Sequence, residues 1–238
     1  ESPTIFDRKL LRARQARART LGAATFLLDR VAEEMGERLA VVLRQFDRSA
    51  DLGTPTDALR RVLTASGKIG AIVAATSAGA AETFAPEGAE VSPFAEASLD
   101  LVVSALALQF VNDLPGTLIQ IRRALKPDGL LLAAMIGGDS LNELRQSFAE
   151  AESEIEGGIS PRVSPFADIR DLGSLLQRAG FALPVIDSDR LTVRYDNPLA
   201  LMRDLRAMGA TNILTERRRT PLKRATLQRM LEIYARRF

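Results

Sequence analysis

The sequence predicts an α/β protein built around a mostly parallel β-sheet. Two observations carry this prediction. Apolar runs typical of buried strands alternate along the chain with segments of helical periodicity, and the connections between them are short. The composition agrees, because 46% of the 238 residues are hydrophobic and 26% are charged, as in ordinary globular proteins. This length can bury a sizeable core in one large domain or two small ones.

The first 45 residues are predicted to be helical. Between Phe6 and Arg19, basic residues recur at close spacing with Ala between them, which indicates a helix with one strongly basic face. From Thr25 to Leu43, apolar residues recur at helical spacing, which predicts an amphipathic helix. We therefore expect residues 1–45 to form an N-terminal helical extension. Residues 46–238 are expected to form the α/β domain, with a basic C-terminal helix.

Within that domain, predicted strands alternate with predicted helices. Strands are expected at 46–52, 69–75, 99–106, 129–136 and 185–195. Helices are expected at 56–64, 116–126, 140–156, 168–179, 198–208 and from 220 onward. Residues 99–106 form a β-branched apolar run of the kind that a sheet covered on both faces requires. Residues 185–195 alternate instead as an exposed strand. Asp139 or Ser140 is expected to cap the helix at 140–156.

The chain lacks two residue types that carry much catalytic and metal-binding chemistry. Neither cysteine nor histidine occurs. This excludes disulfides, thiolate zinc sites, cysteine nucleophiles, Ser-His-Asp catalysis and HExxH zinc chemistry, and no metal site is predicted. The longest uncharged stretch, Ile69 to Ala81, is shorter than the roughly 20 residues of a transmembrane helix. No secretory signal is visible, although Glu1 is not a natural start. We expect a cytoplasmic location, or the mitochondrial matrix in a eukaryote.

The net charge of +2 is distributed unevenly. Residues 1–30 carry a net charge of +4 and residues 211–238 a net charge of +6, whereas the body between them carries −8. The simplest interpretation is two solvated basic helices. The alternative is a surface for an acidic protein or for peripheral attachment to an anionic membrane. Nucleic acid is not expected, because the basic ends lack interleaved aromatic residues.

Two predicted strand ends are candidates for a binding site, because ligands on open α/β sheets bind at the carboxyl ends of strands near the point where the strand order reverses. The first strand ends in Asp-Leu-Gly-Thr-Pro and the third in Ser-Ala. The candidate binding residues are Asp51, Gly53, Thr54, Pro55, Ser104 and Ala105. Asp51 and Gly53 could equally form only the turn into the next helix, and Ser104 could be a small residue required for packing.

A family resemblance follows from longer motifs. Residues 94–138, with Ser-Ala-Leu-Ala-Leu-Gln-Phe-Val-Asn-Asp-Leu-Pro and Arg-Arg-Ala-Leu-Lys-Pro-Asp-Gly, resemble the fourth and fifth strands of class I S-adenosylmethionine-dependent methyltransferases. Ile-Phe-Asp-Arg-Lys at 5–9, Gly-Gly-Ile-Ser-Pro at 157–161 and Met-Gly-Ala-Thr-Asn at 208–212 are similar to the complex I assembly factor 5 branch. That branch is related to the malonyl-carrier-protein methyltransferase of biotin synthesis. The resemblance covers nearly the whole chain.

The resemblance implies a doubly wound, seven-stranded, mostly parallel sheet and an S-adenosylmethionine site at the candidate residues. The cofactor motif departs from the family pattern, however. Asp-x-Gly-x-Gly-x-Gly is replaced at 51–57 by Asp-Leu-Gly-Thr-Pro-Thr-Asp. Pro55 fixes φ and has no N–H. The second strand runs into Ala-Ala-Thr-Ser at 74–77 without the acid that accepts the ribose hydroxyls, and Glu87 and Glu90 are the candidates for an adenine contact.

Four further residues are candidates for substrate binding. Gln109 and Phe110 replace a His-Trp pair common in the branch, so Gln109 could hydrogen-bond a ligand while Phe110 lines the core or a pocket. Arg145 and Arg162 could grip a substrate carboxylate or could lie on the surface. Asn112 and Asp113 are expected to cap the following helix. Alternate glutamates are interpreted as a solvated face rather than a metal site: Glu150, Glu152, Glu154 and Glu156.

Two functions remain open. The first is an S-adenosylmethionine-dependent methyltransferase-like protein with an eroded cofactor site and an unknown small-molecule or protein acceptor. The alternative is a non-catalytic assembly or binding factor that uses the same fold and its basic termini. The resemblance also implies arginine hydroxylation of a complex I subunit, but a two-histidine iron site cannot exist without histidine.

Overall fold

The computed structural model describes residues 4–75 and 94–238. Within them, four parallel strands form one sheet in the order β2-β1-β3-β4. The strands are β1 (Phe46–Leu52), β2 (Ile69–Ala75), β3 (Leu99–Ala105) and β4 (Leu125–Ala134). The parallel α/β architecture predicted from the sequence is therefore confirmed, and the strand order reverses between β1 and β3.

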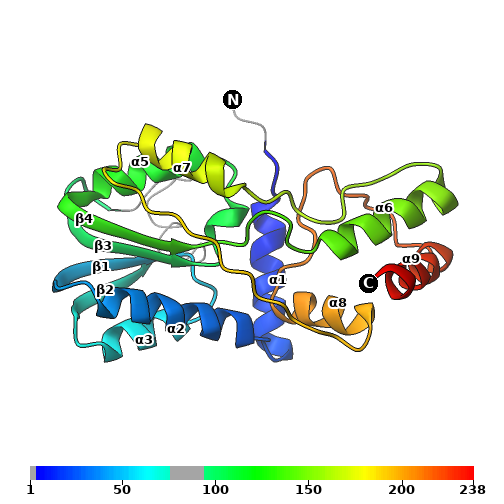
Figure 1. Ribbon diagram of the computed structural model, residues 1–238, viewed down its shortest axis with the longest axis horizontal. Helices are drawn as coiled ribbons and strands as arrows, with labels where there is room; N and C mark the ends of the chain where they lie inside the picture. Colours follow the sequence, from blue (N-terminus) through cyan, green and yellow to red (C-terminus); the bar gives the residue numbers. More distant parts are fainter. Residues whose placement is uncertain (1–3, 76–93) are drawn as a thin grey trace.

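Helices cover both faces of the sheet, which confirms the doubly wound arrangement. In Figure 1, α2 and α3 lie along one face, and α5 and α7 lie along the other. The helices of the described ranges are α1 (Arg8–Leu21), α2 (Phe26–Ala40), α3 (Ala58–Ala65), α5 (Leu114–Ala124), α6 (Asn142–Glu156), α7 (Ile169–Arg178), α8 (Pro198–Ala207) and α9 (Arg224–Arg237).

The core sits on the two central strands. Almost every residue of β3 is buried, because this strand lies inside the sheet and is covered from both sides. Leu101 and Val103 face the α2 and α3 side, and Val102 faces the α5 side. This alternation explains why a predominantly apolar run marks the strand clearly in the sequence. The resulting scaffold fixes where β1 and β3 end.

The expectation of seven strands is wrong for the part of the chain that the structure describes, where four strands are found. The predicted strand at 185–195 is extended there but belongs to no sheet. Val185 is 91% exposed and Leu191 is 51% exposed, so the alternating apolar side chains bury little surface. Alternation predicts a strand only where a neighbour pairs with its backbone. Residues 79–93, predicted to be a loop, lie outside the described residues.

A second group of helices lies beyond the sheet. α6, α8 and α9 share one apolar cluster that includes Phe148, Leu201 and Met230. We call this group the helical lobe. In Figure 1, α1 stands between the sheet and the helical lobe. α2, by contrast, shares the core cluster of Phe46 in β1. The boundary of an N-terminal extension at residue 45 stays a prediction.

The caps of the helices decide where several of them begin. Asp113 accepts a hydrogen bond from the Gly116 backbone N–H at 2.9 Å, so the predicted cap of α5 is confirmed for this residue. The predicted cap of α6 is wrong. Ser140 donates its hydroxyl to the Gly137 carbonyl instead, and the residue before α6 is Leu141 in a left-handed conformation. None of the described helices is long and apolar enough to cross a membrane.

Candidate functional site

The carboxyl ends of β1 and β3 are joined by a buried polar cluster. The side chain of Asp51 is fully buried, and its two oxygens accept hydrogen bonds from different directions. The Thr54 hydroxyl donates to Oδ1 at 2.5 Å, and Arg60 from α3 donates to Oδ2 at 2.7 Å. The Thr54 hydroxyl also accepts the backbone N–H of Ala105 at 3.0 Å. We call these residues, together with Gly53, the strand-end cluster.

Burial raises the pKa of the Asp51 carboxyl above its ordinary value. The hydrogen bonds from Thr54 and Arg60 act in the opposite direction but offset the desolvation only in part. The Arg60 side chain is 23% exposed, so its charge is partly solvated and compensates less than a fully enclosed partner. The fold therefore disfavours the charged form of Asp51 relative to its protonated form.

Gly53 is required by geometry twice over. Its φ of +75° lies in the left-handed region, which favours glycine. A Cβ at this position would also lie 3.1 Å from the Cβ of Ala107, in the turn that follows β3. The Gly53 backbone N–H donates to the Ala75 carbonyl at 3.0 Å. The one glycine kept in this loop therefore serves the turn itself.

Ser104 is placed inside the sheet. Its side chain is fully buried, and the hydroxyl donates to the Leu52 carbonyl at 2.7 Å. This geometry agrees with the packing alternative for Ser104. The six candidate binding residues lie together at the ends of β1 and β3, as the sequence predicted. Their polar groups bond to one another or to the neighbouring Leu52, Arg60 and Ala75.

Gln109 and Phe110 lie just past β3, in a short 3₁₀ turn, η1 (Leu108–Phe110). The Gln109 side chain is buried, and its Nε2 donates to the carbonyl of Leu106 at 2.9 Å. Its Oε1 is buried without a hydrogen-bond partner. Leu106 has a φ of +53°, which is strained for leucine. Phe110 meets the ring of Phe6 edge to face at 6.1 Å, so it forms part of a small apolar core.

Asn112 attaches the start of the chain to this turn. Its Oδ1 accepts the backbone N–H groups of Ile5 at 2.9 Å and of Phe6 at 2.7 Å. The amide nitrogen donates to the Phe6 carbonyl at 3.1 Å. The expectation that Asn112 contributes to the cap of α5 missed this contact, because the partner lies more than 100 residues away in sequence. The N-terminal segment is thereby fixed beside the end of β3.

Arg145 and Arg162 belong to the helical lobe rather than to the strand-end cluster. Arg145 donates to the Ser164 carbonyl at 3.0 Å. The Arg162 guanidinium donates from Nε to Glu152 at 2.9 Å and lies 5.5 Å from the centre of the Phe148 ring. Both side chains hold the segment after α6 in place. A role in gripping a substrate carboxylate stays a prediction for each.

Glu152 corrects the interpretation of the α6 glutamates as a solvated face. It is fully buried and accepts the Ser160 backbone N–H at 2.7 Å as well as the Arg162 guanidinium. Burial by itself raises the pKa of Glu152, but the hydrogen bonds from Ser160 and Arg162 together outweigh it, so the net pKa is lowered. Glu156 is also largely buried, in ion pairs with Arg218 and Lys223.

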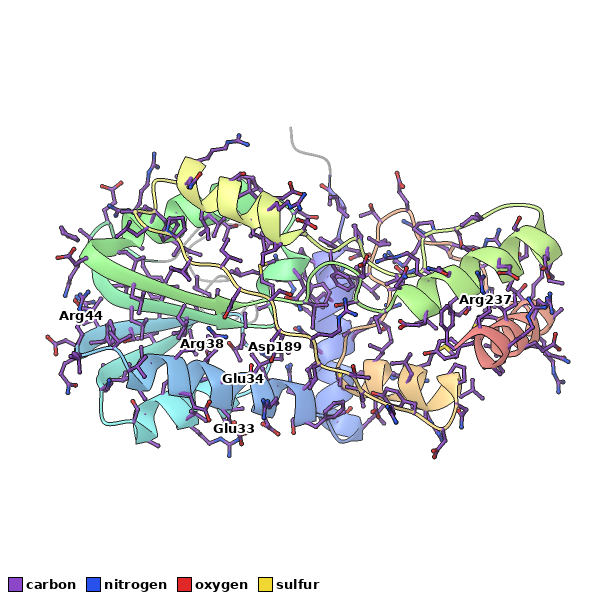
Figure 2. The ribbon with its side chains drawn as sticks, in the orientation of Figure 1. Glu33, Glu34, Arg38, Arg44, Asp189 and Arg237 are labelled. Carbon is purple, nitrogen blue, oxygen red and sulfur yellow. The ribbon has the colours of Figure 1, made fainter. Side chains whose placement is uncertain are left out.

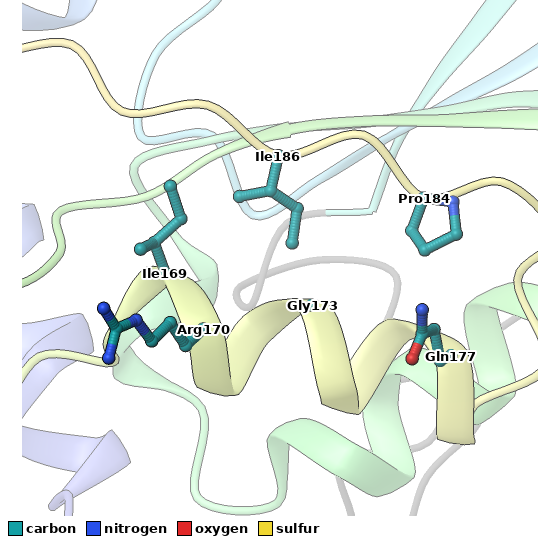
Figure 3. Close-up of a pocket in the computed structure, with 6 residues that line it drawn as sticks. All are labelled: Ile169, Arg170, Gly173, Gln177, Pro184 and Ile186. Carbon is teal, nitrogen blue, oxygen red and sulfur yellow. The ribbon is translucent and has the colours of Figure 1, made fainter.

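A small pocket opens elsewhere, between α7 and the extended segment that follows it. Figure 3 shows its lining from both elements, and its volume is about 280 Å³. The residues that line it are Ile169, Arg170, Gly173, Gln177, Pro184 and Ile186. This volume is below the range usual for small-molecule sites, roughly 300–1,000 Å³. None of the predicted site residues lines it.

Comparison with known proteins identifies the class. A methyltransferase domain model matches residues 68–133, the stretch from β2 through most of β4. Together with the parallel sheet and its strand-end site, this match defines a protein of the class I S-adenosylmethionine-dependent methyltransferase superfamily. A putative methyltransferase from Bacillus halodurans is structurally similar at a TM-score of 0.44, with 16% identity over 65% of this chain and 67% of its own. Similarity of that size adds nothing to the assignment.

Sequence relatives narrow the class to a family. The chain is 40% identical over 226 residues to human "Arginine-hydroxylase NDUFAF5, mitochondrial", covering 90% of this chain and 66% of that protein. The mouse protein of the same name is 39% identical, over 97% of this chain and 70% of its own. A malonyl-[acyl-carrier protein] O-methyltransferase of Xylella fastidiosa is 47% identical over 56% of this chain and 43% of its own. The chain belongs to the NDUFAF5 family. It spans about two thirds of the length of these mammalian relatives.

The strand-end cluster does not fit the cofactor that the superfamily implies. S-adenosylmethionine presents an ammonium group and ribose hydroxyls that need acceptors, and a carboxylate that needs N–H donors. Both oxygens of Asp51 already accept hydrogen bonds, and the N–H groups of Gly53 and Ala105 donate within the fold. Pro55 has no N–H to offer. Glu87 and Glu90 lie outside the described residues.

Sequence reasoning missed Arg60. It lies nine positions after Asp51 on α3, and the loop between them brings its guanidinium back onto the carboxylate. The only available signal was a basic residue in the first turn of the helix that follows the shortened glycine motif. The same reasoning found all the other members of the strand-end cluster. Among the described residues no cluster of three or more acids is placed to hold a metal ion.

Proposed function

We propose that this chain is a methyltransferase-like protein that binds S-adenosylmethionine weakly and acts chiefly as a binding or assembly factor. The observation that carries the proposal is the pairing of Arg60 with Asp51. This pair places a guanidinium against the carboxylate, where a cationic cofactor would need an acceptor without a cation beside it. The human and mouse relatives are named as mitochondrial, which supports the mitochondrial matrix as the location.

The expected loss of affinity follows from the missing contacts. A hydrogen bond to a charged group contributes about 1.5–3 kcal/mol. One such contact is lost with Asp51, and the loop without the family's second and third glycines adds a misfit of about 1–2 kcal/mol, so the total is about 3–5 kcal/mol. Affinity would therefore fall on the order of a hundredfold to a thousandfold, from micromolar to nearly millimolar.

Isothermal titration calorimetry with S-adenosylmethionine tests the proposal directly. We expect the wild-type chain to bind with a dissociation constant near millimolar. The double variant Pro55→Gly, Asp57→Gly restores the glycine spacing of the family motif, and the variant Arg60→Ala frees Asp51. If the pairing of Asp51 is the main defect, Arg60→Ala gains more affinity than the restored loop. Low-micromolar binding by the wild type with one site per chain would overturn the proposal.

The name of the mammalian relatives raises arginine hydroxylation as another candidate function. Proteins that catalyse such an oxidation with non-haem iron commonly bind the iron through histidine. This chain contains no histidine. No residue of the strand-end cluster replaces that ligand type. We therefore keep binding or assembly as the proposed role and leave the methyl acceptor unassigned.

A further inference from the structure

We propose that the exposed face of α1 is a docking surface for an acidic segment of a protein partner. α1 carries six basic side chains between Arg8 and Leu21 and no acidic one. Leu11 and Ala18 point into the fold and are buried, whereas Lys9, Arg17 and Arg19 are exposed. The basic residues of α1 are Arg8, Lys9, Arg12, Arg14, Arg17 and Arg19.

The C-terminal basic helix, α9, differs from α1 because its basic side chains pair with acidic residues of the same chain. α9 packs against α6, whose glutamates face it. Arg229 pairs with Glu154 at 2.5 Å, and Arg237 pairs with Glu150 at 2.5 Å. Figure 2 labels Arg237 on α9, on the helical lobe. The charge of α9 is therefore largely neutralised within the chain.

The exposed cations Lys9, Arg17 and Arg19 of α1 differ from those of α9 in this respect. Within residues 4–75 and 94–238, no ion pair joins Lys9, Arg17 or Arg19 to an acid. Asp7, the acid just before α1, caps the helix and pairs with Arg217 at 3.1 Å. Arg217 is itself close enough to contribute to the lowered pKa of Arg14, after burial. The basic character of this surface thus extends beyond α1.

The composition of the exposed face favours a protein over a lipid surface. Helices that lie in a membrane interface present Trp, Phe or Leu toward the lipid. Between its exposed cations, α1 presents Ala13 and Ala16 instead, and its first large exposed apolar side chain is Leu21 at the end of the helix. Such a face suits a carboxylate-rich segment that forms many ion pairs without inserting apolar groups.

The position of α1 gives this surface a functional setting. It lies between the sheet and the helical lobe (Figure 1), and Phe6, just before it, packs on Phe110 beside the end of β3. A partner bound along α1 would lie next to the strand-end cluster. This inference names the partner class for the proposed binding role, but it does not depend on the affinity for S-adenosylmethionine.

Fluorescence anisotropy with a labelled decaglutamate peptide tests the proposal on the full chain at physiological salt. Reversing Lys9, Arg17 and Arg19 to Glu should weaken binding about tenfold to a hundredfold. The matched control reverses three exposed arginines away from α1, namely Arg48, Arg123 and Arg194, and so changes the net charge equally. We expect the control to retain binding within about threefold. Circular dichroism establishes that both variants are folded.

Three results would overturn the proposal. They are no binding of the peptide by the wild type, a loss of affinity in the control as large as that in the α1 variant, and wild-type affinity in the α1 variant. Co-sedimentation with vesicles of phosphatidylglycerol and phosphatidylcholine separates the lipid alternative. Vesicle binding that depends on Lys9, Arg17 and Arg19, without peptide binding, would assign the surface to a membrane instead. A change in calorimetric affinity for S-adenosylmethionine bears only on the strand-end cluster, so the two proposals fail independently.

Discussion

Two fully buried carboxylates in this molecule pair with arginine and end with opposite pKa shifts. Asp51 lies at the end of β1 with Thr54 and Arg60, and burial raises its pKa. Glu152 lies on α6, where the bonds from Ser160 and Arg162 outweigh the effect of burial and lower its pKa. The surroundings of Glu152 in the helical lobe therefore favour its charged form, whereas the surroundings of Asp51 at the end of β1 disfavour it.

The balance between desolvation and hydrogen bonding explains this difference. Glu152 accepts from a backbone N–H, a hydroxyl and a guanidinium. Asp51 also has a hydroxyl, a guanidinium and, as the weakest contribution, the Thr54 backbone N–H, but its guanidinium partner is partly solvated and desolvation outweighs all three. A buried ion pair contributes to stability only when further hydrogen bonds satisfy the remaining lone pairs. We infer that Glu152 stabilises the fold in its charged form, whereas the charged form of Asp51 is disfavoured by its burial.

The largest predicted effect is the loss of the Glu152 interactions. Glu152→Ala leaves Arg162 without its partner and should lower the free energy of unfolding by at least about 3 kcal/mol. Urea denaturation measures this change. Glu154→Ala, on the exposed face of the same helix, is the matched control and should lose much less. Equal losses in the two variants would contradict the structural role of Glu152.

A smaller effect is expected at the other carboxylate. Asp51→Asn keeps an oxygen for the Thr54 hydroxyl and removes a charge that burial disfavours, while Arg60 can turn toward solvent. The free energy of unfolding should change by no more than about 1 kcal/mol in the same urea titration. A loss as large as that of Glu152→Ala would show that the Asp51–Arg60 pair stabilises the fold.

The smallest predicted effect is the pH dependence of the free energy of unfolding. Glu152 and Asp51 contribute to it with opposite signs. The lowered pKa of Glu152 adds stability above its ordinary pKa of 4.5, and this stability is lost as the pH falls through the folded-state value. The raised pKa of Asp51 has the opposite consequence, because the folded state binds the proton more tightly. Its contribution is most favourable below the ordinary pKa of 3.8 and declines as the pH rises through the raised value.

Urea titrations of the wild type, Glu152→Gln and Asp51→Asn from about pH 3 to pH 7 measure both slopes. The advantage of the wild type over Glu152→Gln should shrink toward low pH. As the pH falls over the same range, the free energy of unfolding of the wild type should rise relative to that of Asp51→Asn. Slopes of the same sign for both variants would remove the contrast between the two sites.

The sheet could be predicted from the sequence because each strand carries its own signal. Residues 99–106 were recognisable as an apolar run, and the matching burial of β3 confirms that interpretation. The segment 185–195 carried an equally regular pattern, but most of its side chains remain exposed because its backbone pairs with no strand. An alternating pattern predicts which side chains a strand would bury. It does not predict whether another strand is present to pair with its backbone.

The glutamates of α6 show a different limit. Positions four apart share one helix face, so Glu150 and Glu154 lie on one side and Glu152 and Glu156 on another. The first pair meets α9, and the second meets Arg162 and Arg218 from distant segments. Nothing within α6 distinguishes the buried pair from the exposed one. The contact of Arg60 with Asp51 was hidden in the same way, because it depends on the path of the intervening loop.

A crystal structure of the chain soaked with S-adenosylhomocysteine tests the central claim most directly, because it shows which partner the Asp51 carboxylate keeps. The account predicts no bound nucleoside beside Gly53 and an Arg60 guanidinium still in contact with Asp51. A product molecule seated there at full occupancy, with its ammonium group on a carboxylate that Arg60 has released, would contradict the account.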